Sequence, residues 1–80
     1  MKITVTMPEL KKGMTSAVLC RWNVEEGQKV KKGFELFETE TEKAVNAVEA
    51  EEDLTVVRLL ADEGDEVAVG APLFEAETAE

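Results

Sequence analysis

The stretch of the chain most open to a chemical role spans residues 37–50 and reads FETETEKAVNAVEA. Two short β-rich runs meet in it at Glu42-Lys43, which predicts a hairpin with these two residues at its tip. Hairpin tips usually carry Gly, Asn or Asp, because those residues tolerate the backbone of a tight turn. A two-residue turn without glycine is expected to be type I-like and to display both central side chains. Lys43 is therefore predicted to be a primary amine on a tip that another enzyme can reach.

Other chemistries find little support in the composition. The chain has no histidine and no tyrosine, so it lacks the commonest general acid–base and the commonest zinc ligand. Its acidic residues follow no EF-hand spacing. The single cysteine, Cys20, excludes an internal disulfide, and we expect it to be buried on the face that carries Val18 and Trp22. The sequence therefore predicts a domain that is not an enzyme by itself.

Charge and length restrict the partners and the compartment. A formal net charge of -9 disfavours nucleic acid and anionic membranes. No run approaches the roughly 18 apolar residues of a membrane span, and the opening MKITVTMPEL lacks the apolar block of a signal peptide. A chain of 80 residues makes one domain. We expect a monomeric, cytoplasmic domain that binds neither nucleic acid nor membrane.

A repeat with an offset of 37 residues organises the chain. Residues 24–40 (VEEGQKVKKGFELFETE) align without a gap on residues 61–77 (ADEGDEVAVGAPLFEAE), with 8 identities in 17 positions. Gly27 and Gly64 hold the same place, which indicates that one turn is made twice. Two copies predict internal two-fold symmetry and not a solenoid, which needs about three repeats. Lys43 lies beyond the matched residues, so the repeat does not require it.

The runs between the turns predict an all-β sandwich or barrel, because they are short and rich in β-branched residues. Ile3 and Val5 alternate onto one face. The one helical competitor, 54–62, carries three consecutive β-branched residues, which favour a strand. The predicted strands are 2–6, 17–24, 29–31, 34–40, 44–50, 54–60, 66–68 and 73–77.

Several motifs together resemble the lipoyl domains, the carrier domains of 2-oxo acid dehydrogenase complex acyltransferases. In order, they are MPEL, Trp22, EEGQKVKKG, ETEKAV and DEGDEVAVGAPLF. The resemblance extends from Met7 to Glu77. At its centre, the family motif Glu-Thr-Asp-Lys-Ala is matched by Glu-Thr-Glu-Lys-Ala between Glu40 and Ala44. The glutamate in place of the usual aspartate adds one methylene before the lysine.

The resemblance implies an architecture as well as a motif. The fold would be a flattened β-barrel, or sandwich, of two four-stranded sheets with pseudo-two-fold symmetry. Residues 1–77 would form the carrier domain, and residues 78–80 a tail or the start of a linker. The loop 9–16, ELKKGMTS, would lie beside the lysine tip and help partner enzymes to recognise the domain. Met14 is expected to be an exposed apolar residue of that loop.

The resemblance also implies a covalent carrier of lipoic acid. Lys43 would hold the lipoyl group as an amide, with Glu40, Glu42 and Ala44 as flanking recognition residues. A lipoate ligase or lipoyl transferase would attach it. A thiamine-dependent 2-oxo acid dehydrogenase component would then load an acyl group, the acyltransferase core would pass it to coenzyme A, and dihydrolipoamide dehydrogenase would reoxidise the arm. Tethering would make these encounters nearly intramolecular.

Three alternatives remain open from the sequence. A biotinyl domain has the same shape but usually flanks its lysine with methionines, where this chain has Glu42 and Ala44. An unmodified binding module, as in the hybrid domains of membrane-fusion proteins, is a second. The third is a solvated lysine that only discourages edge pairing. The sequence also leaves open which complex is served, whether the domain belongs to a larger acyltransferase, and whether a eukaryotic source would place it in the mitochondrial matrix.

Overall fold

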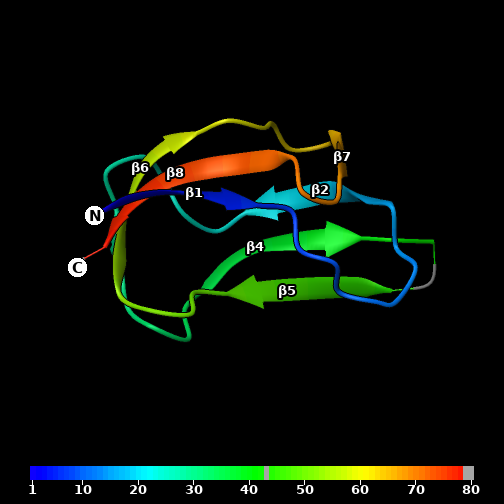
Figure 1. Ribbon diagram of the computed structural model, residues 1–80, viewed down its shortest axis with the longest axis horizontal. Helices are drawn as coiled ribbons and strands as arrows, with labels where there is room; N and C mark the ends of the chain where they lie inside the picture. The colour runs from blue at the N-terminus through cyan, green and yellow to red at the C-terminus, as the bar shows by residue number, and fades with distance from the viewer. Residues whose placement is uncertain (43, 79–80) are drawn as a thin grey trace.

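The computed structural model describes residues 1–42 and 44–78 and arranges them as β-strands (Figure 1). Every predicted strand is present, with its ends within two residues of the prediction. Residues 54–59 of the helical competitor 54–62 form a strand, as the β-branched residues among them predict. The strands are β1 (Lys2–Thr6), β2 (Ser16–Trp22), β3 (Lys29–Val30), β4 (Glu35–Glu40), β5 (Val45–Glu49), β6 (Leu54–Leu59), β7 (Glu66–Ala68) and β8 (Pro72–Thr78).

The strands form two four-stranded antiparallel sheets that face one another, which confirms the predicted fold class. One sheet has the order β1-β8-β6-β3, and the other has the order β5-β4-β2-β7. The core between them centres on Phe37 and Phe74, both fully buried. Trp22 packs edge-on against both rings, with centroids 5.5 and 5.9 Å away. Its indole N–H donates to the Ala61 carbonyl at 3.0 Å, so its polar atom is satisfied as well.

The backbone of the turns repeats the symmetry of the sequence. The N–H of Gly27 donates to the Val56 carbonyl, and the N–H of Gly64 donates to the Leu19 carbonyl, both at 2.7 Å. The two glycines have φ values of 89° and 95°, in the region that residues with a Cβ rarely adopt. The matched glycines therefore mark one turn made twice, and each turn contacts the central strand of the other half.

A β-bulge in β2 changes the face on which its side chains lie. Leu19 pairs with Thr39 and Arg21 pairs with Glu38, which leaves Cys20 as the extra residue. Leu19 is buried, whereas Cys20 is only half-buried. The prediction that Cys20 is buried on one face with Trp22 was therefore wrong, because the bulge reverses the alternation between them.

The corresponding bulge in β6 leaves Val57 unpaired between Val56 and Arg58. Its position is that of Cys20 shifted by the repeat offset of 37 residues, so the bulge belongs to the symmetric scaffold.

Within the described residues, no helix is long and apolar enough to cross a membrane.

Candidate functional site: the hairpin between β4 and β5

The β4–β5 hairpin is closed by paired backbone on both sides of its tip. Glu40 pairs with Val45 at the last step of the ladder. Beyond it, the Thr41 N–H donates to the Ala44 carbonyl at 2.9 Å, and the Thr41 hydroxyl approaches the same oxygen at 3.4 Å. Only two residues lie between Thr41 and Ala44 in the sequence, so the hairpin has the two-residue connection that the sequence predicts.

The predicted flanking residues are placed on the hairpin, whereas the attachment residue lies outside the described part of the chain. Glu40, Glu42 and Ala44 are all exposed. Lys43, predicted to be the attachment point, is not among the described residues, and its role stays a prediction.

The twin of this hairpin in the second repeat is formed by the two ends of the described chain. The Thr78 N–H donates to the Met1 carbonyl at 2.8 Å, and the Thr78 hydroxyl is 3.4 Å from that oxygen. These contacts repeat those of Thr41 with Ala44. Figure 1 shows that the β4–β5 connection and the chain ends lie at opposite ends of the molecule. The hairpin is thus one half of a symmetric pair, in which only this half is a continuous turn.

The loop between β1 and β2 lies beside the hairpin, as the resemblance implies. A groove of about 640 Å³ separates them. Met14 lines it but is half-buried and packed against the core, so the prediction that Met14 is exposed was wrong. The loop folds back onto the barrel, so the Met14 side chain packs against the core and is not exposed to solvent. The full lining is 11–15 from the loop, 16–18 from β2, 40–42 from the hairpin, and Glu66.

Sequence reasoning placed Ser16 beside the tip, as the last residue of the loop 9–16, but it did not place Glu66 at this groove. The Ser16 hydroxyl donates to Oε2 of Glu66 at 2.8 Å across the β2–β7 ladder. No local signal marks this pair, because β2 and β7 are far apart in the chain. Because β2 lies between β4 and β7 in the sheet, Glu66 lines the groove from the side of β2 opposite to Glu40, and Lys11 and Lys12 line it from the loop.

Cys20 lies close to the hairpin but is poorly suited to be a nucleophile. Its Sγ is 3.8 Å from Oε1 of Glu40. Partial desolvation raises the pKa of the Cys20 thiol, and the charge and hydrogen bond of Glu40 and the charge of Glu38 raise it further. The thiol therefore stays protonated at neutral pH, where a reactive cysteine would need the opposite surroundings.

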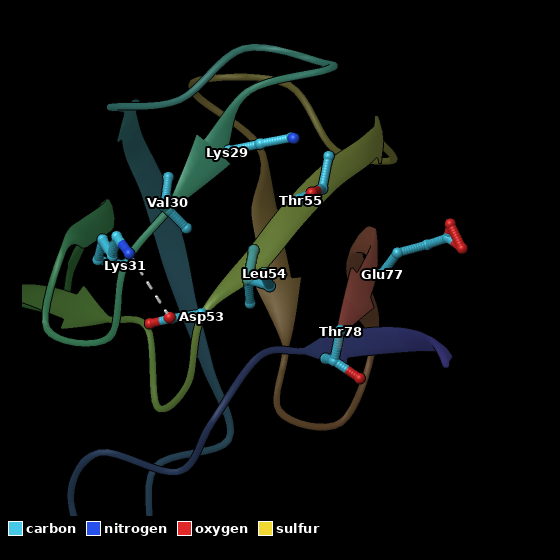
Figure 2. A pocket seen from close by; sticks show the side chains of 8 residues that line it. All are labelled: Lys29, Val30, Lys31, Asp53, Leu54, Thr55, Glu77 and Thr78. Carbon is cyan, nitrogen blue, oxygen red and sulfur yellow. Dashed lines mark ion pairs between the residues drawn. The ribbon is translucent and has the colours of Figure 1, made fainter. Parts of the chain in front are cut away.

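A second hollow, at the end with the chain termini, is the symmetric counterpart of the groove (Figure 2). It has a volume of about 390 Å³. The repeat offset of 37 residues relates the two linings. Leu54 and Thr55 correspond to Ala17 and Val18, and Lys29 corresponds to Glu66. An ion pair in it joins Lys31 and Asp53 at 3.9 Å, and both side chains are largely exposed. The two hollows thus share a scaffold but differ in charge.

The hairpin end combines paired backbone with partly apolar surface beside it. Among the described residues, no cluster of three or more His, Cys, Asp or Glu is arranged to hold a metal ion. The hairpin supplies exposed, paired backbone on either side of its tip. Beside it, the groove offers apolar surface from Met14, Ala17 and Val18.

The comparisons with known proteins agree with this arrangement. A family model described as "Biotin-requiring enzyme", for the biotin/lipoyl family, matches residues 3–76. The dihydrolipoyllysine-residue acetyltransferase component of the pyruvate dehydrogenase complex of Rhizobium meliloti is 42% identical over 66 residues, covering 82% of this chain and 15% of that protein. The component of the same name from Zymomonas mobilis is 42% identical over 71 residues, covering 88% of this chain and 16% of that protein.

Among solved structures, a lipoyl domain matches over its whole length. The solution structure of the lipoyl domain of the 2-oxoglutarate dehydrogenase complex from Azotobacter vinelandii has a TM-score of 0.79 and 26% identity. The match covers 98% of this chain and 99% of that domain. By contrast, the chain spans only about a sixth of the length of the two curated relatives. The chain therefore belongs to the biotin/lipoyl family, and within that family it is a lipoyl domain.

Proposed function

We propose that Lys43 carries lipoic acid as an amide on its Nζ and that the domain presents this group to the active sites of partner enzymes. The observation that carries the proposal is the Glu-Thr-Glu-Lys-Ala motif on a hairpin closed by the Thr41–Ala44 hydrogen bond, in a chain that is a lipoyl domain. Attachment joins the lipoate carboxyl to the lysine amine with loss of water. When bound, the group supplies a disulfide that accepts electrons and an acyl group.

The residues of the chain have positioning roles in this function. The β4–β5 ladder holds the residues on both sides of the tip, which suits a domain that presents a long arm from one place. Amide formation removes the lysine charge and leaves the carboxylates of Glu40 and Glu42 as local marks for recognition. A tethered group meets its partners at a high effective concentration, which is the reason to carry it covalently.

We infer the partners from the relatives and not from contacts in the structure. The curated relatives are named as acetyltransferase components of pyruvate dehydrogenase complexes, and the solved domain comes from a 2-oxoglutarate dehydrogenase complex. The proposed partners are accordingly a lipoate ligase or lipoyl transferase, a thiamine-dependent dehydrogenase component, an acyltransferase core and dihydrolipoamide dehydrogenase. The domain would be a carrier without catalysis of its own, working in the cytoplasm or, in a eukaryotic cell, in the mitochondrial matrix.

Intact mass after incubation with lipoate, ATP and a lipoate ligase tests the proposal. The expected result is one added lipoyl group on the unaltered chain and none on Lys43→Arg. Lys32→Arg is the matched control, because Lys32 precedes a turn glycine inside the repeat and should not matter. Lipoylation that persists in Lys43→Arg would show that another lysine is the site.

A biotinyl carrier is the second candidate, because the matching family model covers both attachments. The same assay with biotin and a biotin ligase separates the two. Glu42 and Ala44 beside the lysine favour lipoate, so the biotinyl adduct should be absent. A chain that accepts neither group would be an unmodified binding module of the same fold.

A further inference from the structure

The two sheets leave an open seam on one side of the molecule, between the edge strands β1 and β5. In the described part of the chain, β1 pairs only with β8 and β5 pairs only with β4. A slot of about 300 Å³ opens between them. Ile3 and Val5 line it from β1 and Val48 lines it from β5, with the buried side chains of Leu36 and Leu54 at its floor. The seam therefore combines two unpaired strand edges with an apolar hollow that reaches the core.

The slot continues into a second hollow along β5. This neighbouring hollow has a volume of about 640 Å³ and shares Pro8, Val48 and Ala50 with the slot. Leu10, from the loop after β1, extends its apolar surface and is 40% exposed. The slot and the neighbouring hollow together form a seam groove that follows β5 from Ala47 to Glu49.

The charge around the seam groove is almost entirely negative. Glu49, Glu51 and Glu52 are exposed on its rim. Among the described residues that line either hollow, Lys32 is the one cation. The chain as a whole carries a net charge of -9, which repels a second copy of itself and other anionic partners. The groove is therefore complementary to a segment that is both apolar and positively charged.

We propose that this seam groove is a docking site for an extended, lysine- or arginine-rich segment of a partner protein. The segment adds as a strand along the free edge of β5, with backbone hydrogen bonds supplying register. One aliphatic or aromatic side chain of the segment enters the slot above Leu36 and Leu54. Its flanking cations pair with Glu51 and Glu52 at the rim, where exposed pairs add selectivity more than affinity.

This site is separate from the tip of the hairpin, although it includes residues of β5. None of its lining residues belongs to the groove beside Met14. Occupation of the seam therefore does not require Lys43 to be modified, and a failure of one proposal leaves the other standing.

The test titrates the ¹⁵N-labelled chain with a short synthetic peptide that alternates lysine with valine and leucine. We expect amide shifts concentrated at Ile3, Val5 and Val48. The double variant Glu51→Gln/Glu52→Gln should weaken binding about fivefold at moderate salt. The control Glu25→Gln/Glu77→Gln makes the same change in net charge away from the seam and should change binding less than about twofold.

Several outcomes would overturn the proposal. Equal weakening by both double variants would mean that the peptide follows net charge and has no defined site. Shifts confined to the tip at residues 40–42 and 44, or no shifts at all, would exclude the seam. Equal binding of the peptide with glutamate in place of lysine would remove the electrostatic basis. Shifts at Val48 on raising the concentration of the chain alone would identify a second copy as the occupant.

Discussion

Glu63 accepts a hydrogen bond from the backbone N–H of Trp22, with Oε2 2.8 Å from the nitrogen. The symmetric contact joins Glu26 to the N–H of Leu59 at 3.0 Å. Each carboxylate belongs to the glycine turn of one repeat. Each N–H belongs to the strand of the other half, shortly after its bulge, in β2 for Trp22 and in β6 for Leu59. A bulge leaves backbone groups without a regular ladder partner, and these glutamates satisfy one at each bulge.

Removing either carboxylate should destabilise the fold. We expect Glu63→Ala and Glu26→Ala each to lower the free energy of unfolding by about 1 kcal/mol, because a charge-assisted hydrogen bond is lost. Urea unfolding followed by Trp22 fluorescence measures the change. Glu25→Ala removes a neighbouring exposed carboxylate and serves as the control, with an expected effect within about 0.5 kcal/mol. Unchanged stability in both test variants would contradict the role of the pair.

The matched glycines should be equally sensitive to substitution. At Gly27 and Gly64 an added Cβ would meet nothing within 4 Å, so the cost comes from the positive φ alone. We expect Gly27→Ala and Gly64→Ala each to destabilise by about 1 kcal/mol. The double variant should be additive, because the two turns bond to different residues, Val56 and Leu19. A large effect at one glycine and none at the other would show that the two turns are not equivalent.

Thr39 should be replaceable by valine with a gain in stability. Its side chain is fully buried on β4, and within the described residues its hydroxyl has no hydrogen-bond partner. An unsatisfied buried hydroxyl costs about 1–3 kcal/mol, so Thr39→Val should raise the free energy of unfolding by about 1 kcal/mol. Thr4→Val, at an exposed position of β1, is the matched control and should stay within about 0.5 kcal/mol. A destabilised Thr39→Val protein would indicate that the hydroxyl has a partner.

The reactivity of Cys20 should depend on Glu40. Because the pKa of Cys20 is raised, less thiolate is present at a given pH than in the unfolded chain. The rate of reaction with a disulfide reagent should therefore rise through a midpoint at higher pH in the folded protein than in urea. Glu40→Gln removes the negative charge beside the thiol, so it should shift this midpoint downward. A midpoint unmoved by Glu40→Gln would leave desolvation and the charge of Glu38 as the causes of the raised pKa.

Exchanging the two residues at the hairpin tip should separate position from charge. The closing pair of Thr41 and Ala44 leaves two places between them, so Glu42→Lys with Lys43→Glu moves the amine by one place without altering the net charge. We expect the protein to fold, as circular dichroism would show, but to gain no lipoyl group by intact mass. Efficient lipoylation of the exchanged protein would mean that the ligase reads the acidic surroundings and not the geometry of the tip.

The sequence by itself determined the strands, the turns and the position of the hairpin. These features depend on local chemistry, namely the alternation of apolar residues and the glycines that accept positive φ, and both are visible along the chain. The repeat added the symmetry, because Gly27 and Gly64 can make equivalent turns only in equivalent halves. The motif around residues 40–44 added the family, which the comparisons confirm.

The tertiary structure alone decided which side chains the scaffold buries and which surfaces it leaves open. Alternation placed Cys20 and Trp22 on one face, but the bulge between them is imposed by pairing with β4, a strand distant in sequence. Met14 is half-buried because its loop folds against a barrel that the loop residues do not encode. The seam between β1 and β5 exists because two edge strands from different sheets meet without pairing. Contacts of this kind join residues far apart in the chain, so no local pattern can specify them.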